Sequence, residues 1–204
     1  MSLYEYDLYL IRELDKGTLV NQIIESGFLQ PIDEDEAYIL GQINCFFREV
    51  INREVPSCPL CILKLEIDNN QLEQVLNSKA QLFISWLEAV CKQHDIAYAF
   101  IGGGSYAAYY EEARLNSEIV FKQVGHLIES GKLEIIHPVM FFSARIGQGR
   151  ICNIANNSPF QIRQSPGVGC LLFLIEGDIS SDNIEILDPG NIYNILLNYF
   201  KKNN

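Results

Sequence analysis

The sequence predicts an α+β protein in which a mixed β-sheet carries packed helices, with a helical N-terminal subregion over about residues 1–55. Apolar residues recur at helical spacing within 1–55 and, more regularly, after Asp68. Short apolar runs bounded by turn residues, which are typical of strands, fill much of the region 58–204. Helices and strands alternate in the middle of the chain and strands then follow one another, and this order favours a mixed sheet.

The first 55 residues allow two interpretations at their start. Ser2 and Glu5 have the spacing of a capping box, which predicts a helix. The apolar residues that follow fit a helix at Tyr4, Leu8 and Ile11, and they fit a strand at Tyr4, Tyr6, Leu8 and Leu10. A second helix is predicted over 18–26, ended by Gly27. A third is predicted to begin at 33–36, with one apolar face made of Leu40, Ile43, Phe47 and Val50.

The middle of the chain predicts strand, helix, strand and helix in turn. An apolar strand is expected over 61–67, and Asp68 or Asn69 is expected to cap the next helix. That helix carries the strongest apolar stripe of the chain, with Trp86 at its centre as a core residue. A buried strand is expected over 96–101, and a long helix over 105–130.

The last third predicts mostly sheet. Strands are expected over 133–136, 139–146, 150–154, 160–163, 168–176 and 184–187, followed by a closing helix after Pro189 and Gly190. The glycines at 147 and 149 predict a hairpin between 139–146 and 150–154. All of these elements are expected to form one domain, because 204 residues with 48% hydrophobic composition suit a single core.

Charge limits the partners of this domain. The net charge is −11, from 26 acidic and 15 basic residues. This surface would repel nucleic acid and anionic membranes, so neither is an expected partner, whereas a basic protein would be attracted. An acidic N-terminus without a signal peptide and short apolar runs predict a soluble, cytoplasmic protein with reduced thiols. The oligomeric state stays open.

A glycine loop is the strongest candidate for ligand binding. It follows the strand predicted over 96–101 and precedes a predicted helix, where backbone N–H groups and the helix dipole would favour a small anion or phosphorylated ligand. The residues expected to contact that ligand are Gly102, Gly103, Gly104, Ser105, Tyr106 and Tyr109. The acidic residue that a dinucleotide fold needs about 20 positions later falls inside the predicted helix, so a dinucleotide is not favoured. A tight structural turn is the competing interpretation.

Three further groups of residues are candidate sites. The first is a zinc set made of Cys58, Cys61, Cys91 and His94, which has valid ligand types but unusually long spacing, so neither a metal nor a cofactor is expected. The second is a catalytic pair of Cys170 and His137, which has no local signature. The third is an aromatic and charged cluster formed by Tyr98, Tyr106, Tyr109, Tyr110, Glu111, Glu112 and Arg114.

Two functions follow from these observations. The favoured one is a binding or interaction module that engages a basic protein, because the chain is acidic, poor in histidine and without a recognisable acid–base constellation. The alternative is an enzyme or ligand-binding protein that holds a small anion at Gly102–Ser105.

Overall fold

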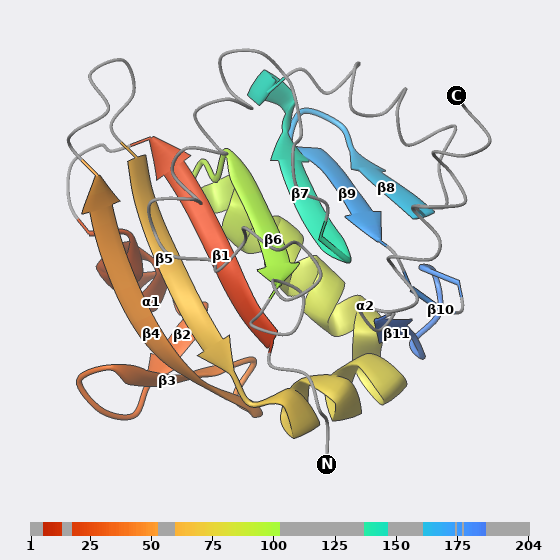
Figure 1. The fold of residues 1–204 in the computed structure, drawn as a ribbon, viewed down its shortest axis with the longest axis horizontal. Coiled ribbons are helices and arrows are strands. Elements are labelled where there is room, and N and C mark those ends of the chain that lie inside the picture. Colours follow the sequence, from red (N-terminus) through yellow and green to blue (C-terminus); the bar gives the residue numbers. More distant parts are fainter. Residues whose placement is uncertain are drawn as a thin grey trace, which may run out of the picture.

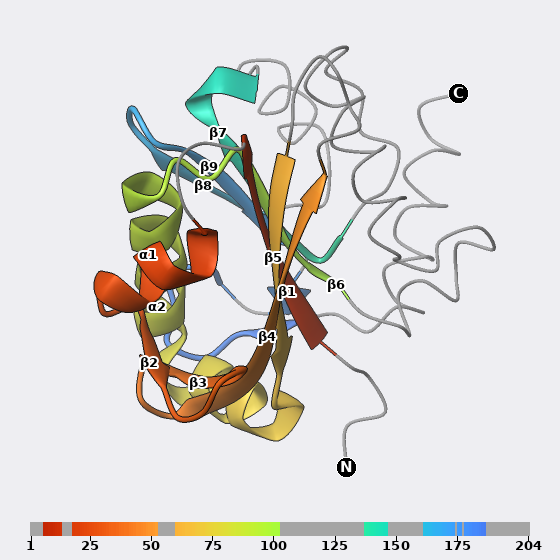
Figure 2. The ribbon, with the colours of Figure 1, turned by 90° about the vertical axis from the view of Figure 1, so that its left-hand side faces the viewer.

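The computed structural model describes residues 6–13, 18–52, 60–102, 137–146, 161–173, 175–176 and 178–186. Over these residues the protein is α+β, with one large antiparallel sheet and two helices on the same face of it (Figures 1 and 2). No helix in these ranges combines the length and the apolar character that crossing a lipid bilayer requires.

The described elements follow one another in this order. They are β1 (Tyr6–Glu13), α1 (Leu19–Glu25), β2 (Leu29–Pro31), β3 (Glu36–Ile39), β4 (Ile43–Asn52), β5 (Leu60–Ile67), α2 (Asn69–Gln93), β6 (Tyr98–Gly102), β7 (Val139–Ser143), the 3-10 helix η1 (Ala144–Ile146), β8 (Gln161–Ser165), β9 (Gly169–Phe173), β10 (Ile175–Glu176) and β11 (Glu185–Ile186).

Nine of these strands form the main sheet, in the order β2-β3-β4-β5-β1-β6-β7-β9-β8. Every pairing between described neighbours is antiparallel, so the predicted mixed sheet is wrong for this part of the chain. β1 lies between β5 and β6 and is antiparallel to both. β5 and β6 therefore run in the same direction without touching, and α2 connects them across the face of β1.

The predicted helical N-terminal subregion is also wrong for the residues described. Within 6–13 and 18–52 only α1 is helical, and it confirms the helix expected over 18–26. β1 replaces the first predicted helix, and β3 and β4 replace the third. The side chains of β1 explain the ambiguity, because residues on both of its faces are buried. An apolar run without polar interruptions has no clear period, and here the strand interpretation was correct.

The two faces of the sheet carry separate apolar clusters. The larger lies between the sheet and the helices, and β1 contributes Leu8 and Leu10 to it. The smaller lies on the opposite face, where β1 contributes Tyr9 and Ile11. β1 thus belongs to the core on both sides, which explains why the four residues at its middle, 8–11, are all apolar.

The helix α2 confirms the predicted N-terminal cap and the predicted core residue. Asp68 caps it by accepting a hydrogen bond from the backbone N–H of Gln71 at 3.0 Å. Trp86 is buried, its ring stacks on Phe83, and its Nε1 donates to the carbonyl oxygen of Phe28 at 3.0 Å. α2 therefore anchors the segment that follows α1 to the face of the sheet.

A kink divides α2 at Lys79, whose φ of −150° and ψ of 38° are not helical. A distant segment supplies partners for the backbone groups released there. The carbonyl oxygen of Asp182 accepts from the N–H of Ala80, and its carboxylate accepts from the N–H of Gln81, both at 3.2 Å. Asp182 thus caps the second half of the helix from outside it.

The other expected elements have mixed outcomes. The strands predicted over 61–67, 96–101, 160–163, 168–176 and 184–187 each overlap a described strand. The strand predicted over 139–146 ends at Ser143 and pairs with β6 and β9. Its expected hairpin partner at 150–154, the strand over 133–136, the helix over 105–130 and the closing helix lie outside the described residues.

Candidate functional site

The predicted glycine loop is described only at its first residue. Gly102 ends β6 and is buried, and a Cβ placed on it would lie 2.7 Å from Nδ1 of His137. No side chain fits there without displacing the imidazole. The remaining predicted contacts, Gly103, Gly104, Ser105, Tyr106 and Tyr109, lie outside the described residues. β6 is antiparallel to both neighbours, so the rule that ligands bind at the carboxyl ends of parallel strands does not apply here.

His137 packs as part of an aromatic stack. Its ring lies 3.9 Å from that of Phe100, which in turn stacks on Tyr9 at 4.5 Å. Burial lowers the pKa of His137 to about 3, so the imidazole is neutral near pH 7. Cys170 lies farther along the sheet, opposite Phe142 on β7. The two residues predicted as a catalytic pair thus stand at different levels of the same face.

The predicted zinc ligands are described for three of four residues, because Cys58 lies outside. Burial, followed by the charge of Glu49, raises the pKa of the Cys61 thiol to about 12. Burial also raises the pKa of Cys91. Burial and then the charge of Arg12 lower the pKa of His94. Among the described residues no group of three or more His, Cys, Asp or Glu side chains is placed to hold a metal ion.

Only one member of the predicted tyrosine cluster is described. Tyr98 is fully buried between the rings of Phe100 and Phe142, at 5.3 and 5.0 Å. It is therefore a core residue. The other members, Tyr106, Tyr109, Tyr110, Glu111, Glu112 and Arg114, lie outside the described residues.

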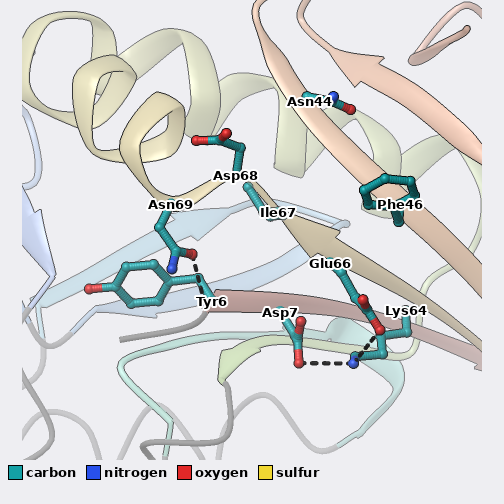
Figure 3. Close-up of a pocket in the computed structure, with 9 residues that line it drawn as sticks. All are labelled: Tyr6, Asp7, Asn44, Phe46, Lys64, Glu66, Ile67, Asp68 and Asn69. Carbon is teal, nitrogen blue, oxygen red and sulfur yellow. Dashed lines mark hydrogen bonds and ion pairs between the residues drawn. The ribbon is translucent and has the colours of Figure 1, made fainter. Parts of the chain in front are cut away.

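A site that the sequence reasoning missed lies where β5 leads into α2 (Figure 3). It is a cavity of about 420 Å³, here called the acidic recess. The residues that line it are Tyr6, Asp7, Asn44, Phe46, Lys64, Glu66, Ile67, Asp68 and Asn69. They come from β1, β4, β5 and the start of α2, and their charged members are three carboxylates and one ammonium group.

Lys64 forms two ion pairs in this recess. Its Nζ lies 3.1 Å from a carboxylate oxygen of Asp7 and 2.8 Å from one of Glu66 (Figure 3). Burial lowers the pKa of Lys64, but the hydrogen bond to Glu66 and the charge of Asp7 outweigh it and raise the pKa. The recess therefore binds an ammonium group already, and that group belongs to the chain itself.

An exposed aromatic ring stands beside these charges. The side chain of Phe46 on β4 is 52% exposed, more than any other large apolar side chain among the described residues. In the register of the sheet it lies between Glu36 on β3 and Glu66 on β5. Tyr38, which is 38% exposed, lies on the same face one strand farther out. The open face of β3–β5 thus places two exposed aromatic rings beside two carboxylates, while the exposed Arg48 lies opposite Lys64 farther along β4 and β5.

Hydrogen bonds fix the walls of the recess. The backbone of Asn44 is bonded on both sides to the start of α2, with its N–H donating to Oε1 of Gln71 and its carbonyl accepting from Asp68. Oδ1 of Asn69 accepts from the N–H of Tyr6 at 2.9 Å (Figure 3). These bonds hold the beginnings of β1, β4 and α2 together, so the backbone around the recess is fixed before any ligand arrives.

No known family matches. Comparisons with protein-family models, curated proteins and solved structures find no match to this chain. Its function is therefore inferred from the geometry and charge of the molecule.

Proposed function

We propose that the protein is a binding module that docks a basic protein partner on the acidic recess and on the open face of β3–β5. The observation that carries this proposal is the exposed ring of Phe46, flanked by Glu36 and Glu66 at the mouth of a recess with excess negative charge. Exposed aromatic residues surrounded by charge are typical of protein interfaces.

The chemistry of the recess favours an arginine or lysine side chain as the central contact. A guanidinium or ammonium group would find carboxylates of Asp7 and Glu66 for charge-assisted hydrogen bonds. It would also find the ring of Phe46, over which a cation is attracted by the π electrons. The acidic turn at 33–36 adds negative charge beside this face and would speed the approach of a basic partner.

Binding of short peptides tests the proposal, with arginine-rich, lysine-rich and glutamate-rich sequences as probes. We expect the two basic peptides to bind, with an affinity that falls as salt is raised, and the acidic peptide not to bind. Phe46→Ala and Glu66→Gln should each weaken binding about fivefold, since an exposed cation–π contact or rim ion pair contributes on the order of 1 kcal/mol.

Matched controls separate this surface from general acidity. Leu82→Ala removes another exposed apolar side chain, and Glu185→Gln removes another exposed carboxylate, so neither should change the affinity. Lys64→Met removes the ammonium group that pairs with Asp7 and Glu66 and should tighten binding. Lys79→Met makes the same change in net charge at an exposed position outside both cavities and should not. Equal effects of Lys64→Met and Lys79→Met, or unchanged binding in Phe46→Ala, would contradict the proposal.

A further inference from the structure

A second cavity, of about 200 Å³, lies at the C-terminal end of α2, the opposite end of this helix from the acidic recess. We call it the helix-end pocket. Its floor is formed by Cys91, Ile96 and Ser143, which are buried. Its exposed rim includes Lys92 and Asp95. The pocket therefore opens to solvent above a floor that contains polar atoms.

Ser143 is the unusual member of the floor. The residue is 7% exposed, and its hydroxyl has no hydrogen-bond partner among the described residues. Its backbone is fixed, because its N–H donates to the carbonyl oxygen of Ala97 at 3.0 Å. A buried hydroxyl without a partner is unfavourable, so a ligand that hydrogen-bonds to it would be stabilised.

The charges around the pocket select the ligand. The C-terminal end of a helix carries a partial negative charge, and the carboxylate of Asp95 lies directly after the end of α2. The thiol of Cys91 stays neutral, because burial raises its pKa. Asp95 has a φ of +52°, a backbone conformation in which glycine is the least strained residue. An aspartate at this position therefore makes the fold less stable than a glycine would.

We propose that the helix-end pocket binds a small molecule with a primary ammonium group, which donates to the Ser143 hydroxyl and pairs with Asp95. The negative end of α2 and Asp95 together disfavour a ligand whose only charged group is a carboxylate. A simple alkylamine and a free amino acid share the required ammonium group. Lys92 on the rim would add an ion pair for the amino acid only. This proposal stands on different residues from the docking surface and is independent of it.

Ligand-detected NMR with three probes of similar size tests the proposal and distinguishes the two sources. The probes are propylammonium, alanine and propionate. We expect propylammonium to bind in the millimolar range, as suits a ligand of few atoms, and propionate not to bind. Tighter binding of alanine than of propylammonium would assign the pocket to amino acids, and the reverse order would assign it to alkylamines.

Two variants test the named contacts. Ser143→Ala and Asp95→Asn should each weaken ammonium binding at least about fivefold, the effect of one lost hydrogen bond or ion pair. Glu185→Gln, which removes an exposed carboxylate that does not line the pocket, is the matched control. Melting temperatures show whether each variant is folded. If the Ser143 hydroxyl stabilised the fold, Ser143→Ala would lower the melting temperature. Because this hydroxyl has no hydrogen-bond partner among the described residues, we expect the melting temperature to stay unchanged.

Asp95→Gly should change stability and ligand binding in opposite directions. Glycine relieves the positive φ, so this variant should melt at an equal or higher temperature while binding propylammonium more weakly. Binding of propionate as tight as that of propylammonium would overturn the proposal. So would binding by neither amine, or amine binding that is unchanged in both Ser143→Ala and Asp95→Asn.

Discussion

Trp86 allows the packing of α2 to be tested with two graded substitutions. The side chain is 5% exposed, it stacks on Phe83 with 5.7 Å between ring centroids, and it donates one hydrogen bond to the carbonyl of Phe28. Trp86→Phe keeps an aromatic ring against Phe83 but removes the donor. Trp86→Ala removes the ring as well and leaves a cavity between α2 and the segment after α1.

The expected losses of unfolding free energy differ because the two variants remove different contacts. Trp86→Ala should cost about 3–5 kcal/mol, the range for truncating a large buried aromatic residue. Trp86→Phe should cost about 1–2 kcal/mol, chiefly for a buried carbonyl that loses its donor. Leu82→Ala, on the same helix but 44% exposed, should change stability by less than about 0.5 kcal/mol.

Urea unfolding followed by far-ultraviolet circular dichroism measures all four proteins. Fluorescence is unsuitable, because the chain has only one tryptophan and both variants remove it. The midpoints should shift while the slopes stay equal, so that the shifts report stability. A cost below about 1 kcal/mol for Trp86→Ala would refute this account of the packing. So would equal costs for Trp86→Ala and Trp86→Phe.

Three more predictions concern other parts of the fold. Asp182→Ala should lower the free energy of unfolding by about 1 kcal/mol in thermal or urea unfolding, because the N–H of Gln81 at the kink of α2 loses its acceptor. An unchanged stability would mean that this cap does not stabilise the kink. His137 is neutral in the fold, where its pKa is about 3, but in the unfolded chain it binds a proton below about pH 6.5. The free energy of unfolding should therefore fall as the pH drops from about 6.5 toward about 3. At pH 5 the loss from this residue is about 2 kcal/mol, and His137→Phe should abolish that dependence; an unaltered pH profile would count against it. All six cysteines should titrate as free thiols in denaturant without reductant, and the four buried ones described here should react slowly in the native protein; four or fewer thiols would disprove this.

The sequence predicted the type of an element correctly where one face of that element is buried and the other is exposed to solvent. α2 has that pattern, and its cap at Asp68 and its core residue Trp86 were both predicted. β4 was misread because Ile43 and Phe47 recur at a spacing that fits a helix. In the sheet these two side chains pack toward the helices, whereas Val50 packs on the opposite face. Two partly buried faces on one strand can therefore imitate one helical stripe.

The acidic recess could not be predicted from the sequence, because no local pattern contains it. Asp7, Phe46 and Lys64 come from three separate strands, and the register across β4, β5 and β1 brings them together. That register depends on pairing between distant segments, which the strand propensity of each segment does not predict. The one local signal was the polar alternation of Lys64 and Glu66 within an otherwise apolar strand, which marks a position open to water.

The position of β1 has a consequence for how the chain folds. β1 precedes the other described strands in the chain, yet its two partners in the sheet arrive only with residues 60–67 and 98–102. Until then a strand with four consecutive apolar residues, 8–11, has two unpaired edges, which is the state most prone to pairing with another chain. Distant pairing also slows folding, since a long loop must close before the contacts form. The nascent protein is thus most vulnerable to aggregation before β6 has been synthesised, and it would benefit from a chaperone that shields its first strand during that interval.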